Sequence, residues 1–195
     1  TKLSLSALAV KRIEKCRKYL DDKLSNNGDP IYGINTGFGY LQHIKIESEN
    51  LTQLQHNLLL SHACGTGQEV PKEIVKLMLL LKVQSLSYGH SAIALTTVQR
   101  LIDFYNNDIL PVIYTQGSLG ASGDLAPLAH LALPLIGEGE VWYKDERITA
   151  TDLNKNFGWE SLMLQSKEGL ALINGTQFMS AYGTFCLLKA EQLSH

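Results

Sequence analysis

The sequence predicts a mainly α-helical fold that carries one short β-hairpin. Hydrophobic residues recur at intervals of three and four positions through most of the chain, which is the spacing of helices with one buried face. Two glycine-rich stretches interrupt these helices and are predicted to be loops. Residues 141–143 and 147–149 are rich in β-branched and aromatic residues on either side of a polar turn, and this pattern predicts the hairpin.

Each helix is placed by its hydrophobic spacing and by the residues that begin or end it. Residues 26–30 contain asparagine, glycine and proline, which end the first helix. Pro71 is favoured in the first turn of a helix, and Asp124 is expected to cap the helix that follows it. The predicted helices cover residues 5–24, 51–63, 71–88, 91–105, 125–132 and 176–193.

The glycine-rich loops cover residues 31–39 and 112–123. Three glycines in the first loop permit unusual backbone angles and movement. Ile44 and Ile46 alternate with polar residues after this loop, and the alternation predicts a brief strand.

The chain divides into two predicted parts. Residues 1–110 form an N-terminal helical domain that carries the first loop, and residues 111–195 hold the second loop and the start of a central helical bundle. The last helix is apolar on most sides, so it is expected to be buried in more protein than 195 residues supply. We therefore expect the chain to be the front portion of a larger helical protein.

Composition and charge exclude several classes of protein. With 17 basic and 19 acidic side chains and a formal net charge of -2, no basic face predicts a nucleic-acid or membrane partner. The most apolar run, residues 77–81, is too short to cross a bilayer. Three widely spaced cysteines argue against a disulfide framework, and the histidines show no metal-ligand spacing. We expect a cytoplasmic protein that has no signal peptide and binds no metal.

The most informative segment is residues 117–130, Gly-Ser-Leu-Gly-Ala-Ser-Gly-Asp-Leu-Ala-Pro-Leu-Ala-His. A purely structural interpretation is a glycine loop that leads into a capped helix. Phosphate binding at the helix N-terminus is a second interpretation, but no Gly-Lys-Ser/Thr sequence follows. A serine nucleophile is a third, but Asp124 stands where the Gly-x-Ser-x-Gly pattern requires its last glycine.

A fourth interpretation of this segment is covalent. The amide nitrogen of Gly123 can attack the carbonyl carbon of Ala121 and close a five-membered ring, because glycine has no Cβ to obstruct the approach. Loss of one water from the ring and one from Ser122 leaves 4-methylideneimidazol-5-one (MIO). This group is a strong electrophile, which no unmodified side chain offers.

Together with three other motifs, this segment resembles the aromatic amino-acid ammonia-lyase and aminomutase family. The four motifs occur in the family's order and together span most of the chain, so the resemblance is very specific. They are residues 32–39 (Tyr-Gly-Ile-Asn-Thr-Gly-Phe-Gly), 55–65 (Gln-His-Asn-Leu-Leu-Leu-Ser-His-Ala-Cys-Gly), 117–130, and 167–177 (Lys-Glu-Gly-Leu-Ala-Leu-Ile-Asn-Gly-Thr-Gln). The resemblance implies the N-terminal part of a helical bundle of the aspartase and ammonia-lyase type, which continues beyond residue 195 in a homotetramer.

The resemblance also implies a role for each site residue. Residues 121–123 form MIO autocatalytically, without an added cofactor. Tyr32 matches the catalytic base, His62 matches a residue that contacts the substrate side chain, and Asn174 matches one that holds the electrophile and the polar end of the substrate. A free tyrosine has a pKa of about 10, so a base of this kind needs a positive environment, such as a helix N-terminus supplies.

His62 bears on the choice of substrate. Its polar atoms can hydrogen-bond an imidazole or a phenol, but they would be unpaired against a bare phenyl ring. Ser61-His62-Ala63 resembles the pattern of histidine-using members, so we expect elimination of ammonia from L-histidine to give trans-urocanate. Tyrosine is left open as the substrate of a lyase or an aminomutase. The resemblance places further pocket residues beyond residue 195, so the isolated chain is expected to be inactive, and a non-catalytic helical module is the second hypothesis.

Overall fold

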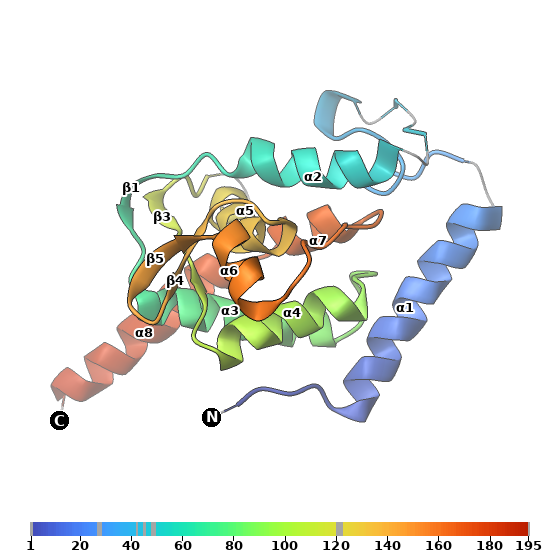
Figure 1. The fold of residues 1–195 in the computed structure, drawn as a ribbon. Coiled ribbons are helices and arrows are strands. Elements are labelled where there is room, and N and C mark those ends of the chain that lie inside the picture. Colours follow the sequence, from blue (N-terminus) through green and yellow to red (C-terminus); the bar gives the residue numbers. More distant parts are fainter. Residues whose placement is uncertain are drawn as a thin grey trace.

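The computed structural model describes residues 2–26, 29–41, 43–44, 46–47, 50–119 and 123–194, and it confirms a mainly α-helical fold (Figure 1). All six predicted helices are present. The helices are α1 (Ala7–Asn26), α2 (Leu51–His62), α3 (Lys72–Ser87), α4 (Leu95–Asn106), α5 (Leu125–Ala132), α6 (Ala150–Phe157), α7 (Glu168–Ile173) and α8 (Gln177–Ser194). The strands are β1 (Thr66–Glu69), β2 (Leu110–Pro111), β3 (Tyr114–Gln116), β4 (Glu140–Tyr143) and β5 (Glu146–Thr149).

The predicted hairpin is formed by β4 and β5, which pair antiparallel with Val141 opposite Ile148. Lys144 and Asp145 between them have φ angles of 49° and 63°, the left-handed turn that a two-residue hairpin loop requires. β2 extends this hairpin into a three-stranded sheet by pairing with β4.

One sequence prediction about loops was wrong. Residues 114–116 lie in β3, which pairs with β1, although all of 112–123 was predicted to be loop. Of the predicted brief strand at Ile44 and Ile46, Lys45 lies outside the described residues. Gly37 donates to the carbonyl of Ile44 at 3.0 Å, and Ile46 donates to the carbonyl of Asn35 at 2.9 Å, which is the paired bonding of a short antiparallel bridge and agrees with that prediction. These bonds tie the segment to the first glycine-rich loop.

The hydrophobic core lies around α3, which packs against α1, α4 and α8. α2 crosses over α5 and α7 on the opposite side of the molecule from α3 and α4 (Figure 1). Among the described residues, α8 is buried only at Gln177, Phe178 and Ala181. Leu187 and Leu193 of this helix are 62% and 89% exposed, which agrees with the expectation that its burial needs more protein than these 195 residues supply. No helix of the described ranges is long and apolar enough to cross a membrane.

Candidate active site

Tyr32 lies in the first glycine-rich loop, and its side chain is exposed. Its hydroxyl accepts a long hydrogen bond of 3.5 Å from the amide of Gly39, across the turn. The turn packs closely on α7, because a Cβ on Gly33 would lie 2.8 Å from Cδ2 of Leu170. Gly33 also has a φ of +71°, which disfavours other residues. The loop backbone is thus held against α7 while the phenol faces outward.

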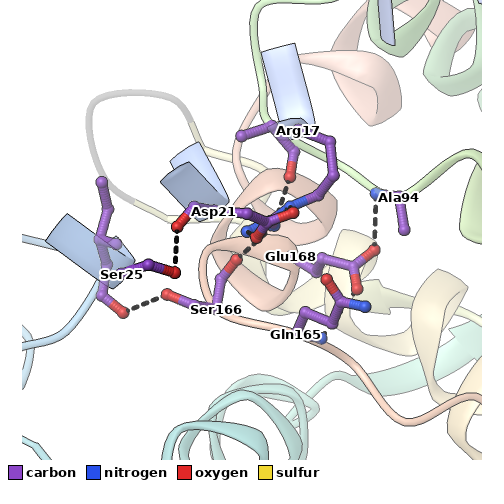
Figure 2. Close-up of polar contacts among 9 residues, drawn as sticks. Arg17, Asp21, Ser25, Ala94, Gln165, Ser166 and Glu168 are labelled. Carbon is purple, nitrogen blue, oxygen red and sulfur yellow. Dashed lines mark hydrogen bonds and ion pairs between the residues drawn. The ribbon is translucent and has the colours of Figure 1, made fainter. Parts of the chain in front are cut away.

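Ser166 connects the Tyr32 turn to α1. Its hydroxyl donates to the carbonyl of Ile34 at 2.6 Å. Its own carbonyl accepts from the Arg17 guanidinium of α1 at 2.8 Å, and the same nitrogen of Arg17 donates to the carbonyl of Ala92 at 2.8 Å (Figure 2). Arg17 is buried and also pairs with Asp21 one turn later in α1. The buried guanidinium of Arg17 thereby fixes Ser166, which lies just before α7 and binds the Tyr32 turn.

Glu168 begins α7 and is 1% exposed. Its carboxylate points toward Ala94 and Gln165 (Figure 2). One carboxylate oxygen accepts from the amide of Ala94 at 3.0 Å and from the hydroxyl of Thr97 at 2.7 Å. The other oxygen accepts from the amide of Gln165 at 2.8 Å. Glu168 of α7 therefore caps the N-terminus of α4. α4 begins at Leu95 rather than at the predicted residue 91.

His62 is the last residue of α2 and is half-buried. Its Nδ1 lies 2.9 Å from the carbonyl oxygen of Leu58. A carbonyl oxygen only accepts, so Nδ1 carries the hydrogen, and Nε2 of the neutral ring is an acceptor. α2 itself is fixed to α7, because the amide of Gly169 donates to the buried side chain of Gln55 at 2.9 Å.

Two of the three predicted electrophile residues, Ala121 and Ser122, lie outside the described residues. Gly123 is described, and its φ of +77° is a left-handed conformation that suits glycine. The hydroxyl of Ser118 donates to the carbonyl of Gly123. The chain is thus held on the C-terminal side of the predicted ring.

Asp124 does not cap α5, and this prediction was wrong. Its backbone lies near φ -107° and ψ 10° rather than in the extended region of a typical N-cap, and within the described chain its side chain makes no capping bond to α5. The buried carboxylate instead accepts from the amides of Phe178 at 2.9 Å and Met179 at 3.1 Å, so it caps α8. Burial raises the pKa of Asp124, whereas these two backbone hydrogen bonds lower it.

Asn174 ends α7, and its exposed side chain stands at the turn between α7 and α8. Its carbonyl accepts from Nζ of Lys82 at 3.0 Å. Lys82 was missed in the sequence, although Met78, Leu79, Val83 and Leu86 at helical spacing place it on the buried face of α3. Burial lowers the pKa of Lys82 to about 7, and the Asp124 carboxylate opposes this shift.

The predicted site residues are thus joined through α7. The Tyr32 turn packs on its side, α2 with His62 is bonded to its first turn, and Asn174 stands at its end. Asp124, next to Gly123, holds the helix that follows Asn174. No cluster of metal-binding side chains occurs among the residues that the structure describes.

Comparison with known proteins decides which family this arrangement belongs to. The chain matches the family model for aromatic amino acid lyases over residues 1–195. It belongs to that family. The predicted resemblance and the helical lyase fold are therefore confirmed.

Among its relatives, the chain is 48% identical to histidine ammonia-lyase of Deinococcus radiodurans, over 98% of the chain and 36% of that protein. It is 47% identical to histidine ammonia-lyase of Shouchella clausii, over 100% of the chain and 39% of that protein. The chain superposes on the crystal structure of histidine ammonia-lyase from Trypanosoma cruzi with a TM-score of 0.88 and 37% sequence identity, over 98% of the chain and 37% of that structure. The chain thus spans little more than a third of the length of the curated relatives it matches.

Proposed function

We propose that the chain supplies the N-terminal part of a histidine ammonia-lyase, which eliminates ammonia from L-histidine to give trans-urocanate. The observation that carries the proposal is the 48% identity to a bacterial histidine ammonia-lyase over nearly the whole chain. His62 is compatible with this substrate, because an acceptor Nε2 of the neutral ring suits an imidazole N–H as it does a phenol O–H. The resemblance of Ser61-His62-Ala63 to the pattern of histidine-using members favours histidine over tyrosine.

The electrophile in this proposal is MIO, formed from Ala121, Ser122 and Gly123. The fit rests on Gly123, whose left-handed backbone and pinned carbonyl suit a tight, compressed loop. MIO would supply an electron-poor carbon, and this electrophile would assist the elimination of ammonia. Ring closure releases two waters, so the mature protein should be lighter by that amount.

The chain's own residues then divide the remaining work. Tyr32, exposed on a turn whose backbone is fixed by Ser166, is the proposed base that takes the β-hydrogen of the substrate. His62 orients the imidazole of the substrate, and Asn174 holds its amino-acid end. Ammonia leaves with the electron pair of the carbon–nitrogen bond, and the β-proton passes to Tyr32. Tyr32 then releases this proton, which ammonia takes up, so the products are urocanate and ammonium.

The proposal also includes how the chain is organised. Residues 1–110 contribute Tyr32 and His62, and residues 111–195 contribute the electrophile and Asn174. We further propose that a polypeptide that contains this chain and has the length of its relatives acts as a homotetramer in the cytoplasm. Residues 1–195 alone are proposed to be inactive. The completed polypeptide is called the full-length protein below.

The test is to supply the full-length protein with L-histidine and with L-tyrosine and to follow urocanate and coumarate by ultraviolet absorbance. Faster release of urocanate supports the proposal, whereas faster release of coumarate supports the tyrosine alternative. A His62→Phe variant should lose turnover of histidine, because a phenyl ring cannot accept the imidazole N–H. Robust turnover by residues 1–195 alone would contradict the proposed need for the remaining length.

A further inference from the structure

Lys82 is one of the largest of the fully buried side chains among the described residues, with 1% of its surface exposed. It lies on the face of α3 that otherwise carries core residues such as Met78, Leu79 and Leu86. Lysine is almost never buried to this extent unless its amine has polar partners, because transfer of the ammonium out of water is costly. Polar groups around Nζ must therefore offset the cost of burying this amine.

Nζ of Lys82 contacts the turn that carries a proposed substrate-binding residue. It donates to the carbonyl of Asn174, which is 92 residues further along the chain, at 3.0 Å. This carbonyl ends α7, so the hydrogen bond fixes the backbone from which the Asn174 side chain leaves. The contact joins the rigid core helix α3 directly to the site.

The same turn is held from its other side by Asp124. The Asp124 carboxylate binds the first amides of α8, at Phe178 and Met179, four and five residues after Asn174. Asp124 is also the charged group that acts on Lys82 in opposition to burial. Asp124 directly follows Gly123. Lys82 and Asp124 together therefore link the electrophile segment to the Asn174 turn.

We propose that Lys82 is a positioning residue, which together with Asp124 fixes the Asn174 side chain relative to the electrophile at Gly123. The expected effect on catalysis rests on the proposed function. Its structural part, the hold of Lys82 on residues 174–179, is independent of any activity. An apolar side chain of similar length would fill the same volume but could not hold the turn.

The experiment compares Lys82→Met with Lys76→Met in the full-length protein. Lys76 lies on the same helix but is partly exposed, and the ion pair that it makes with Asp108 is at the surface. Backbone amide exchange over residues 174–179 should accelerate about tenfold or more in Lys82→Met, because a hydrogen bond that holds the turn is lost. With L-histidine, kcat should fall about 30-fold or more while KM stays within about threefold, because the reacting groups are misplaced rather than absent. Lys76→Met should change neither quantity by more than about twofold.

A double-mutant cycle separates positioning from general support of the fold. If Lys82 acts with Asp124 on one turn, the combination of Lys82→Met with Asp124→Asn should lower kcat no more than about threefold below the worse single variant. Fully additive losses would overturn the proposal, as would wild-type exchange and kcat in Lys82→Met. If Lys82→Met does not fold, Lys82→Gln, whose donor has a shorter reach, decides by the same measurements.

The two proposals fail in different ways. If the wild-type full-length protein deaminates neither histidine nor tyrosine, the proposed function is wrong, and the exchange measurement still decides whether Lys82 holds the turn. If the wild type is active but the exchange of residues 174–179 does not respond to Lys82→Met, only the positioning role is wrong.

Discussion

Replacement of Glu168 by glutamine should loosen both ends of a connection between α7 and α4. The carboxylate accepts hydrogen bonds from Ala94, Thr97 and Gln165. A glutamine oxygen can still accept from Ala94 and Thr97, but its NH₂ group then faces the amide of Gln165. The loss of that charged acceptor costs about 1.5–3 kcal/mol, and the weaker neutral bonds to the other two groups bring the expected loss to about 2–4 kcal/mol.

The assay is amide hydrogen exchange at the start of α4 and α7 in the full-length protein. A loss of about 2–4 kcal/mol in the free energy of local opening corresponds to exchange about 30- to 1000-fold faster over residues 94–98 and 165–169. Glu191→Gln on the exposed face of α8 is the matched control and should leave these segments unchanged. If exchange in Glu168→Gln stays within about twofold of wild type, the argument that this carboxylate caps α4 is refuted.

Three further predictions concern the electrophile, the backbone and pH. Ser122→Ala should abolish nearly all turnover and leave the mass of the protein without the loss of two waters; wild-type turnover would rule out MIO. Gly89→Ala should lower the thermal unfolding midpoint far more than Gly158→Ala, because both have positive φ but only at Gly89 would a Cβ lie 2.6 Å from the backbone of Arg12. The expected difference is about 2 kcal/mol or more, and equal midpoints would contradict it. Because the folded protein lowers the pKa of Lys82 from 10.5 to about 7, the unfolded chain binds more protons between these values. Wild-type stability should therefore rise with pH across this window relative to Lys82→Met, by up to about 5 kcal/mol, whereas parallel stability curves would show that the shift is absent.

Local sequence patterns predicted much of this fold. The hydrophobic spacing of the long helices, the polar turn at Lys144 and Asp145 and the four family motifs each depend on residues close together in the sequence. These features were confirmed because hydrophobic periodicity and turn chemistry report local structure directly.

The errors arose where distant residues determine the structure. Residues 114–116 form a strand by pairing with residues 66–69. The sequence of so short a strand does not predict this distant partner. Asp124 caps a helix that begins 53 residues later, and α4 begins where Glu168 accepts from the amide of Ala94 and the hydroxyl of Thr97. Lys82 is different, because the apolar spacing around it already places a charge on a buried face, and that conflict could have been recognised.

The brevity of α7 has a consequence for engineering. A helix of six residues is far too short to be stable alone. Its shape is imposed by packing on α2, on α5 and on the turn of Tyr32 and by its bonds to α3 and to α4. A segment of this kind cannot be transplanted by itself. Chimeras between relatives of different substrate preference should exchange residues 165–179 only together with the partners Gln55, Lys82 and Asp124.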